Sequence, residues 1–167
     1  YNTTTNLVEF YDGGEWRDLQ SEDIPPIPSE NFSAVLYTGT GSTQSITGVG
    51  FQPDFVWIKN RDTTNWHLIN DSSRGANNSI FTNSTQGNQI NDANGYISSF
   101  DTDGFTVTSG NTVNGNGNNL VAWCWKANGG TTSSNTDGSI TSTVQANTKA
   151  GFSIITWAGT GGVNTVG

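Results

Sequence analysis

The sequence is poor in the residues that most often build reactive centres, with one cysteine, one histidine and no methionine in 167 residues. Because Cys124 has no second cysteine to pair with, a disulfide framework within the chain is excluded. A metal site built on several histidines is also excluded, since His67 is the only imidazole. The missing methionine leads us to expect an ordered stretch of a longer protein, unless an initiator residue was removed.

Charge is also scarce, and basic charge above all. Only six residues are lysine or arginine, against 14 acidic residues, which gives a net charge of −8. Nucleic-acid phosphates require clustered lysine and arginine, so we expect no nucleic-acid partner. No apolar run approaches the roughly 20 residues that span a bilayer, and no signal peptide is visible, so we expect no membrane partner.

The chain is rich instead in glycine, asparagine, threonine and serine, and its large apolar residues are mainly aromatic or β-branched. Such residues suit pleated surfaces, and no segment shows the 3.6-residue period of an amphipathic helix. The pattern predicts an all-β fold, an antiparallel β-sandwich of the jelly-roll or lectin-like type. Strands are expected at residues 33–38, 54–60, 65–70, 79–83, 96–100, 105–108, 119–127 and 139–144.

A β-hairpin is predicted for residues 1–19, because Asp12-Gly13-Gly14 can form a tight turn between residues 7–11 and the returning residues 15–19. A single hairpin is marginally stable in water, so its aromatic side chains need a surface to pack on. The predicted attachment residues are these aromatic side chains, Phe10, Tyr11 and Trp16. A Pro-rich linker follows at residues 20–30, which we expect to be extended and semi-rigid.

The sequence then repeats itself. Residues 32–41 (FSAVLYTGTG) are echoed 120 positions later by residues 152–161 (FSIITWAGTG). A period of this size indicates a duplicated domain rather than a solenoid repeat. We therefore divide the rest of the chain into a β-sandwich module at 31–128, a connection with one strand at 129–150, and the start of a second, truncated module copy at 151–167.

Catalysis has little support in the sequence. His67 falls in a predicted strand, where a structural imidazole is more common than a catalytic base. Ser72, Asp71 and His67 could be counted as a triad, but no Gly-x-Ser-x-Gly elbow surrounds a serine. Asp101 and Asp103 flank a turn, which explains them better than glycoside hydrolysis or calcium binding. We therefore expect no enzyme activity, no catalytic residues, no metal site and no cofactor.

Binding is a stronger alternative, because the chain holds six tryptophans and an exposed indole can stack on a sugar ring. The candidate glycan-binding residues are Trp66, which has polar neighbours, and Arg74, which lies in a predicted loop. Arg74 could instead hold loop carbonyls or the carboxylate of Asp71.

Two further tryptophans flank the cysteine. Trp123 and Trp125 are two residues apart, so they share one face of a strand, and Cys124 lies on the other. We expect the two indoles in the sandwich core and the thiol to be buried and structural.

Five segments match a known module in order and spacing: residues 51–61 (FQPDFVWIKNR), 71–75 (DSSRG), 98–105 (SSFDTDGF), 121–126 (VAWCWK) and 135–140 (NTDGSI). The chain from about residue 31 onward resembles a module that recurs in structural proteins of tailed bacteriophages, especially marine ones. Residues 1–16 (YNTTTNLVEFYDGGEW) are similar to short hairpins common in phage fibre and appendage proteins.

The resemblance implies a lectin-like sandwich in a virion protein that is assembled in the cytoplasm of the bacterial host. The favoured hypothesis is a fibre or spike whose N-terminal hairpin anchors it to another virion protein of the neck, portal, tail or capsid. By analogy with such fibres, we expect sister chains to associate as a homotrimer. Two alternatives stay open: a glycan-binding host-receptor module, and a capsid decoration protein.

Overall fold

The computed structural model describes residues 9–11, 13–18 and 27–167 of the chain. These residues form an all-β fold, as the sequence predicts, and the named strands pair in antiparallel fashion throughout. Within the described segments, no helix has the length and apolar character that crossing a membrane requires.

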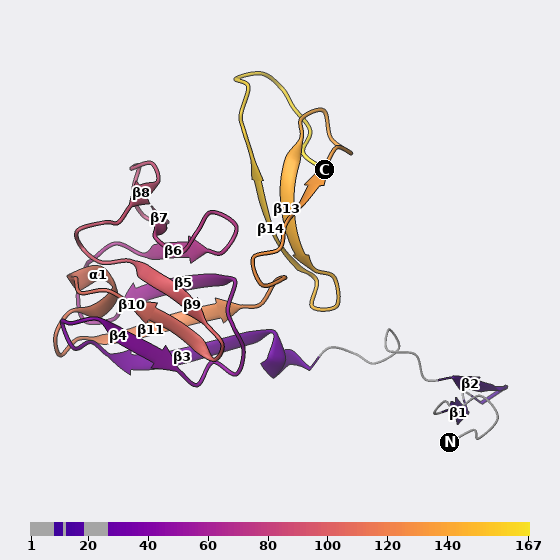
Figure 1. Cartoon of the computed structure of the whole chain (residues 1–167), viewed down its shortest axis with the longest axis horizontal. Coiled ribbons are helices and arrows are strands. Elements are labelled where there is room, and N and C mark those ends of the chain that lie inside the picture. The colour runs from indigo at the N-terminus through magenta and orange to yellow at the C-terminus, as the bar shows by residue number, and fades with distance from the viewer. Residues whose placement is uncertain (1–8, 12, 19–26) are drawn as a thin grey trace.

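Two sheets form the body of the molecule. The strands of the larger sheet are β3 (Phe32–Thr38), β5 (Phe55–Asn60), β6 (Leu68–Asp71), β7 (Asn78–Phe81), β8 (Gln89–Ile90) and β11 (Asn119–Trp125). They follow the spatial order β3-β11-β5-β6-β7-β8. The strands of the smaller sheet are β4 (Gln44–Thr47), β9 (Ile97–Asp101) and β10 (Gly104–Val107), in the order β4-β10-β9. The two sheets lie face to face as a sandwich (Figure 1).

The core lies between the two sheets because alternate residues of each strand point into it. From the larger sheet, Val56, Ile58 and Leu120 are fully buried. Phe105 and Val107 of β10 meet them from the smaller sheet and are also fully buried. The alternation that predicts the strands therefore also explains how the two layers are held together.

The expectation that Trp123 and Trp125 lie in the core is wrong. The core-facing residues of β11 are Leu120, Ala122 and Cys124, which are all fully buried. Because side chains alternate along a strand, Trp123 and Trp125 lie on the opposite side from these three residues. Both indoles are therefore on the outer face of the larger sheet, where they are half-buried. The cysteine is buried as expected, and its burial raises the pKa of the Cys124 thiol to about 12.

Several elements differ from the sequence-based expectation because tertiary contacts decide them. The polar strand β4 is not predicted, yet it pairs with β10 along its whole length. A single helical turn, α1 (Asn111–Asn114), is also unpredicted and is held by Asn114. The side-chain oxygen of Asn114 accepts from the Thr40 amide at 2.8 Å, and its amide group donates to the carbonyls of Ser42 and Thr108. The strand expected at 65–70 begins only at Leu68.

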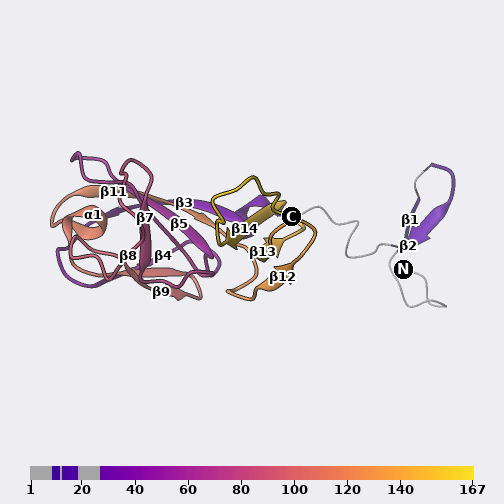
Figure 2. The same ribbon diagram turned by 90° about the horizontal axis from the view of Figure 1, so that it is seen from above.

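The N-terminal hairpin consists of β1 (Glu9–Tyr11) and β2 (Trp16–Asp18), which pair with each other. Gly13 has a φ of +99°, which the turn between the strands requires. Figures 1 and 2 draw the hairpin apart from the sandwich. The predicted turn residue Asp12, the side chain of Phe10 and the linker residues 19–26 lie outside the described residues. Pro28, at the end of the predicted linker, opens a 3-10 turn at Pro28–Glu30.

A third sheet follows the sandwich. It contains β12 (Ser133–Asn135), β13 (Ser142–Asn147) and β14 (Phe152–Trp157), in that spatial order. The strand expected at 139–144 is thus shifted to Ser142–Asn147, and β12 is an addition. Figures 1 and 2 show this C-terminal sheet standing beside the sandwich, with β14 nearer to it than β13.

The predicted turn at residues 101–104 joins β9 to β10, and its carboxylate holds a second loop in place. Asp103 accepts hydrogen bonds from the amides of Gly48 at 3.0 Å and Gly50 at 2.6 Å, and its backbone carbonyl accepts from Val49 at 3.2 Å. These amide hydrogen bonds hold the pKa of the Asp103 carboxyl below its usual value.

We predict that Asp103→Asn weakens the acid dependence of stability. A carboxyl whose pKa is lowered in the folded state stabilises the protein above its unfolded pKa of about 4, and this contribution is lost as the pH falls through the lower, folded value. The free energy of urea unfolding, measured from pH 7 downward, should therefore fall less steeply below about pH 4 in the variant than in the parent chain. Glu30→Gln controls for the change in net charge. Equal acid dependence in the parent and in Asp103→Asn would contradict the assignment.

Candidate functional site

The outer face of the larger sheet is unusually apolar for a sheet surface that is open to solvent. Antiparallel sheets commonly carry polar residues on such a face. Here the aligned residues Trp123, Trp57, Ile69 and Ile80 form one row across β11, β5, β6 and β7. The rings of Trp57 and Trp123 have centroids 5.3 Å apart, and Ile80 is exposed. Ile69 and Ile80, at one end of this row, line the candidate site.

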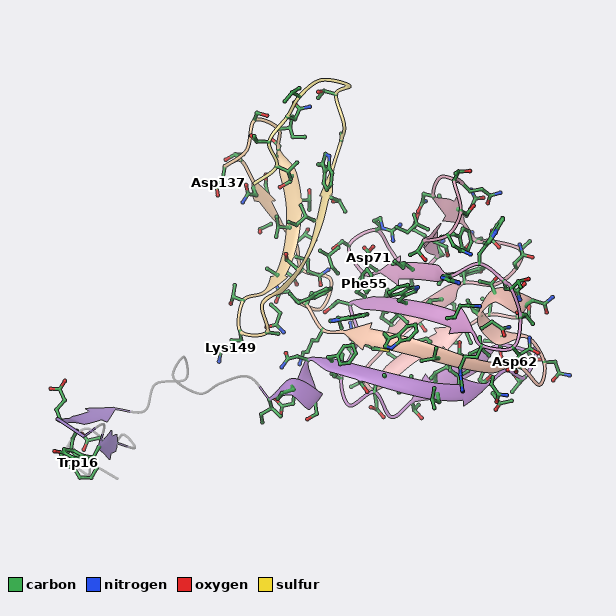
Figure 3. The ribbon with its side chains drawn as sticks, turned by 180° about the vertical axis from the view of Figure 1, so that it is seen from behind. Trp16, Phe55, Asp62, Asp71, Asp137 and Lys149 are labelled. Carbon is green, nitrogen blue, oxygen red and sulfur yellow. The ribbon has the colours of Figure 1, made fainter. Side chains whose placement is uncertain are left out.

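A groove of about 740 Å³ lies between this outer face and β14. All six residues of β14 line the groove. Its apolar lining comes from Phe55, Ile69 and Ile80 of the sandwich and from the apolar residues of β14, which include Ile155 and Trp157. Its polar lining consists of Asp71, Arg74, Asn78 and Asn88 of the sandwich and of Ser153 and Thr156 of β14. Figure 3 labels Phe55 and Asp71 on the side of the sandwich that faces the C-terminal sheet. The volume is within the range of binding sites for small molecules and short segments.

The buried carboxylate of Asp54, which precedes β5, holds the segment that follows β11. Its oxygens accept hydrogen bonds from the amides of Ala127 at 2.7 Å, Gly129 at 3.0 Å and Gly130 at 3.0 Å. The Ser72 hydroxyl donates a fourth bond at 2.7 Å. The positive φ angles of Gly129 and Gly130 allow neighbouring amides to converge on one anion. Asp54 therefore sets the path of the chain as it leaves β11.

Gln145 of β13 continues this hydrogen-bond network into the C-terminal sheet and is fully buried. Its side-chain oxygen accepts from the amides of Asn128 at 3.0 Å and Gly130 at 2.9 Å. Its amide nitrogen donates to the hydroxyls of Ser72 at 2.9 Å and Ser73 at 2.8 Å. We call Asp54, Gln145 and these partners the joint, because they connect β13 to the sandwich.

Aromatic packing supports the joint from β14. The ring of Phe152 lies 5.9 Å from that of Phe55 and 6.0 Å from that of Trp125, measured between centroids. Nearby, the side-chain amide of Asn147 donates to the side-chain oxygen of Asn31 at 2.7 Å. A polar contact of β13 and aromatic contacts of β14 therefore both hold the C-terminal sheet against the sandwich.

The structure places the candidate residue Arg74 at the edge of the groove. Its Nε donates to Asp71 at 2.6 Å and its Nη1 donates to Asn88 at 3.0 Å. The Nη2 atom is buried and has no hydrogen-bond partner among the described residues. Arg74 thus joins the loop after β6 to the segment before β8, which is the structural role that the sequence left open for it.

Trp66, the other candidate glycan-binding residue, lies elsewhere. Its ring packs on Phe81 with centroids 4.9 Å apart, and it is half-buried against the core. It lines a separate depression of about 260 Å³, together with Thr64, Asn65, Asn94 and Thr112. The structure therefore does not bring Trp66 and Arg74 together in one pocket.

The predicted attachment residues form a small aromatic surface on the hairpin. Tyr11 and Trp16 are opposite each other across β1 and β2, with ring centroids 5.5 Å apart. Tyr11 is 57% exposed and Trp16 is 68% exposed. Phe10 lies in β1, but its side chain is outside the described residues.

The residues that could be counted as a triad make other contacts. The Ser72 hydroxyl is bonded to Asp54, and Asp71 is paired with Arg74. Partial burial and the nearby Lys59 lower the pKa of His67. No group of three or more histidine, cysteine, aspartate or glutamate side chains that could hold a metal ion occurs in the part of the chain that the structure describes.

Of the residues that line the groove, sequence reasoning named Arg74 as a binding candidate and missed those of β14. Ile155 and Trp157 appear in the repeated segment, but the echo alone does not show that the second copy exposes them. Asp54 and Gln145 are separated by 91 positions (145 minus 54), and a polar residue in a strand gives no sign of a distant partner. Gln145 is uncharged like the rest of β13, and its burial is seen only in the folded chain, so the sequence contains no signal for this contact.

The chain belongs to the family described as "Domain of unknown function (DUF7483)", whose match covers residues 27–167. The match begins at the end of the predicted linker and includes the sandwich, the joint and the C-terminal sheet. No curated protein and no solved structure matches the chain.

We predict that Gln145→Ala loosens the C-terminal sheet without unfolding the sandwich. The substitution leaves the amides of Asn128 and Gly130 without one acceptor, a loss of about 1–3 kcal/mol for buried groups. Hydrogen exchange at the amides of β13 and β14 should accelerate by about 5- to 150-fold, whereas core amides of β5 and β11 should keep their rates. Gln89→Ala, in β8, is the matched control. Unchanged exchange in β13 and β14 would show that Gln145 does not hold the joint.

Proposed function

We propose that this chain is a structural protein of a tailed-bacteriophage particle, a fibre or spike. In this proposal the N-terminal hairpin anchors the protein to a neck, portal, tail or capsid protein, and the sandwich modules project outward. The proposal is supported by the sequence resemblance to phage appendage modules and by the arrangement of the described residues.

The observation that carries the proposal is the exposed pair of Tyr11 and Trp16. Two large aromatic side chains that pack against each other at a tilt, yet stay more than half exposed, present a ready contact surface. Burying such area contributes about 25 cal/mol per Å², and tyrosine and tryptophan are frequent hot spots of protein interfaces. A two-stranded hairpin is marginal alone, so docking on a partner would also stabilise the hairpin.

The rest of the chain supports a role as a spacer. The joint holds the sandwich and the C-terminal sheet together through buried hydrogen bonds, so consecutive units keep a defined orientation. Basic residues are few, and the net charge is −8, which does not favour polyanionic partners. Association of sister chains into a trimer is part of the proposal by analogy.

A glycan-binding role has weaker geometric support. Trp66 packs on Phe81 rather than standing free, and it shares no pocket with Arg74. A sugar platform needs an accessible indole with polar groups converging beside it. A capsid decoration protein would use the same hairpin, and images of particles in negative stain separate it from a projecting fibre.

We predict that Trp16→Ala removes the protein from particles while the sandwich stays folded. Truncating a central interface tryptophan costs about 2 kcal/mol or more, which weakens attachment by about 30-fold. Particles purified from a phage that encodes the variant should therefore contain little of the protein by quantitative mass spectrometry.

Leu36→Ala is the control, because it removes a large apolar side chain that is as exposed as Trp16, at 68%, from the outer face of β3. Particles carrying this control should retain the protein at the parent level. Normal incorporation of Trp16→Ala would refute the anchoring role. The core amides of the free variant should exchange as slowly as in the parent chain, which shows that loss from particles is not caused by unfolding.

A further inference from the structure

Strand β14 is a copy of β3, but its two faces are used in the opposite way. In β3, Val35 and Tyr37 pack against the sandwich core, and Leu36 between them is 68% exposed. At the matching positions of β14, Ile155 is 38% exposed and Trp157 is 56% exposed. The face that forms a core in the first copy is therefore open in the second.

The other face of β14 is the one in contact with the sandwich. Phe152 packs on Phe55 and Trp125, and Ile154 is only 8% exposed. Their counterparts in β3 are Phe32 and Ala34, which lie on the outside of the first module. The second copy is thus seated outer face to outer face on the first, with its core face directed away.

The edges of the two strands point to the same conclusion. One edge of β3 pairs with β11 along seven residue pairs, and the amide of Gly39 extends the pairing by donating to Asn118 at 2.8 Å. Strand β14 pairs with β13 on one edge, and no strand of the described residues lies along the other. That edge borders the groove, because all six residues of β14 line it.

Natural proteins usually protect an open edge with charge, proline or a bulge. Neither β13 (STVQAN) nor β14 (FSIITW) contains a charged residue or a proline. An open edge, an uncovered apolar face and an adjoining apolar groove together form a site for strand addition.

We propose that the groove binds a β strand from a second module, and that this strand corresponds to β11 of the first module. This inference rests on the tandem-module arrangement of the proposed function and names the segment that the groove receives. The added strand pairs with the open edge of β14. One of its faces packs on Ile69 and Ile80 of the first module, and the other joins Ile155 and Trp157 in a new core.

The chemistry of β11 fits both faces of this site. One face of β11 carries the apolar residues Val121, Trp123 and Trp125. A strand that lies over Ile69 and Ile80 needs an apolar face of this kind toward them. The other face of β11 carries Leu120, Ala122 and Cys124, which in the first module are buried beside the core face of β3. If the β14 edges of two chains paired with each other, the backbone groups of the edge would be hydrogen-bonded, but no layer would cover Trp157. A second module supplies both the edge pairing and the covering layer.

The test uses the full chain and a synthetic peptide with the sequence of residues 118–126, in which Cys124→Ser prevents oxidation. Hydrogen exchange of the chain is measured with and without the peptide. In an edge strand every second amide points away from its partner, so alternate amides of β14 should become protected. Peptide at about ten times its Kd should slow their exchange by about tenfold, and amides of β3 should not change.

Two matched variants locate the contact. Ile155→Asp should abolish the protection, whereas Leu36→Asp, on the outer face of β3, should leave it intact. Native exchange at the core amides of β5 shows that each variant is folded. A peptide with the same residues in scrambled order should protect nothing.

Absence of protection at β14 with the parent chain would overturn the proposal. A chain dimer that forms through β14 in the absence of peptide, and that Ile155→Asp dissolves, would also overturn it in favour of a second copy as the occupant. Because no phage particle takes part, these outcomes are independent of whether Trp16 anchors the protein.

Discussion

The arrangement of this protein depends on the buried carboxylate of Asp54. A carboxylate removed from water is costly unless several hydrogen bonds stabilise it. Asp54 accepts four, three of them from backbone amides within residues 127–130. These bonds fix the direction in which the chain leaves the sandwich. Gln145 then fastens β13 to the same backbone, and β14 follows from β13. The groove exists because this joint holds β14 over an apolar sheet face rather than releasing it into solvent.

The fold class follows from the sequence because a single physical rule, alternation of side chains across a strand, governs it. The same rule does not determine which of the two alternating sets of side chains is buried. The sequence-based prediction for Trp123 and Trp125 therefore chooses the wrong face of the sheet. The small residues Ala122 and Cys124 lie on the core-facing side of β11, and the indoles lie on its outer face. Strand β4 and helix α1 could not be foreseen, since their hydrogen bonds reach residues more than 50 positions away. The candidate site depends on such distant pairs even more, because Asp54 and Gln145 meet only in the folded chain.

The two exposed aromatic surfaces have different origins and, in our account, different partners. The pair of Tyr11 and Trp16 is exposed because a hairpin has only two strands and no second layer. Trp157 is exposed because it lies on the face of the repeated strand β14 that corresponds to the core face of β3, and no second layer among the described residues covers that face. In the proposed function, the first surface contacts a different protein of the virion. In the further proposal, the second surface contacts a copy of the module itself.

The most direct test of this account measures whether the joint holds the C-terminal sheet in one orientation. Spin labels at Leu36→Cys in β3 and Thr143→Cys in β13 report the distance between the two units by pulsed electron paramagnetic resonance, while Cys124 stays unlabelled because it is buried. The account predicts a single narrow distance distribution, as narrow as that of a control pair at Leu36 and Ser98 within the sandwich. A broad or multiple distribution for the first pair alone would contradict it.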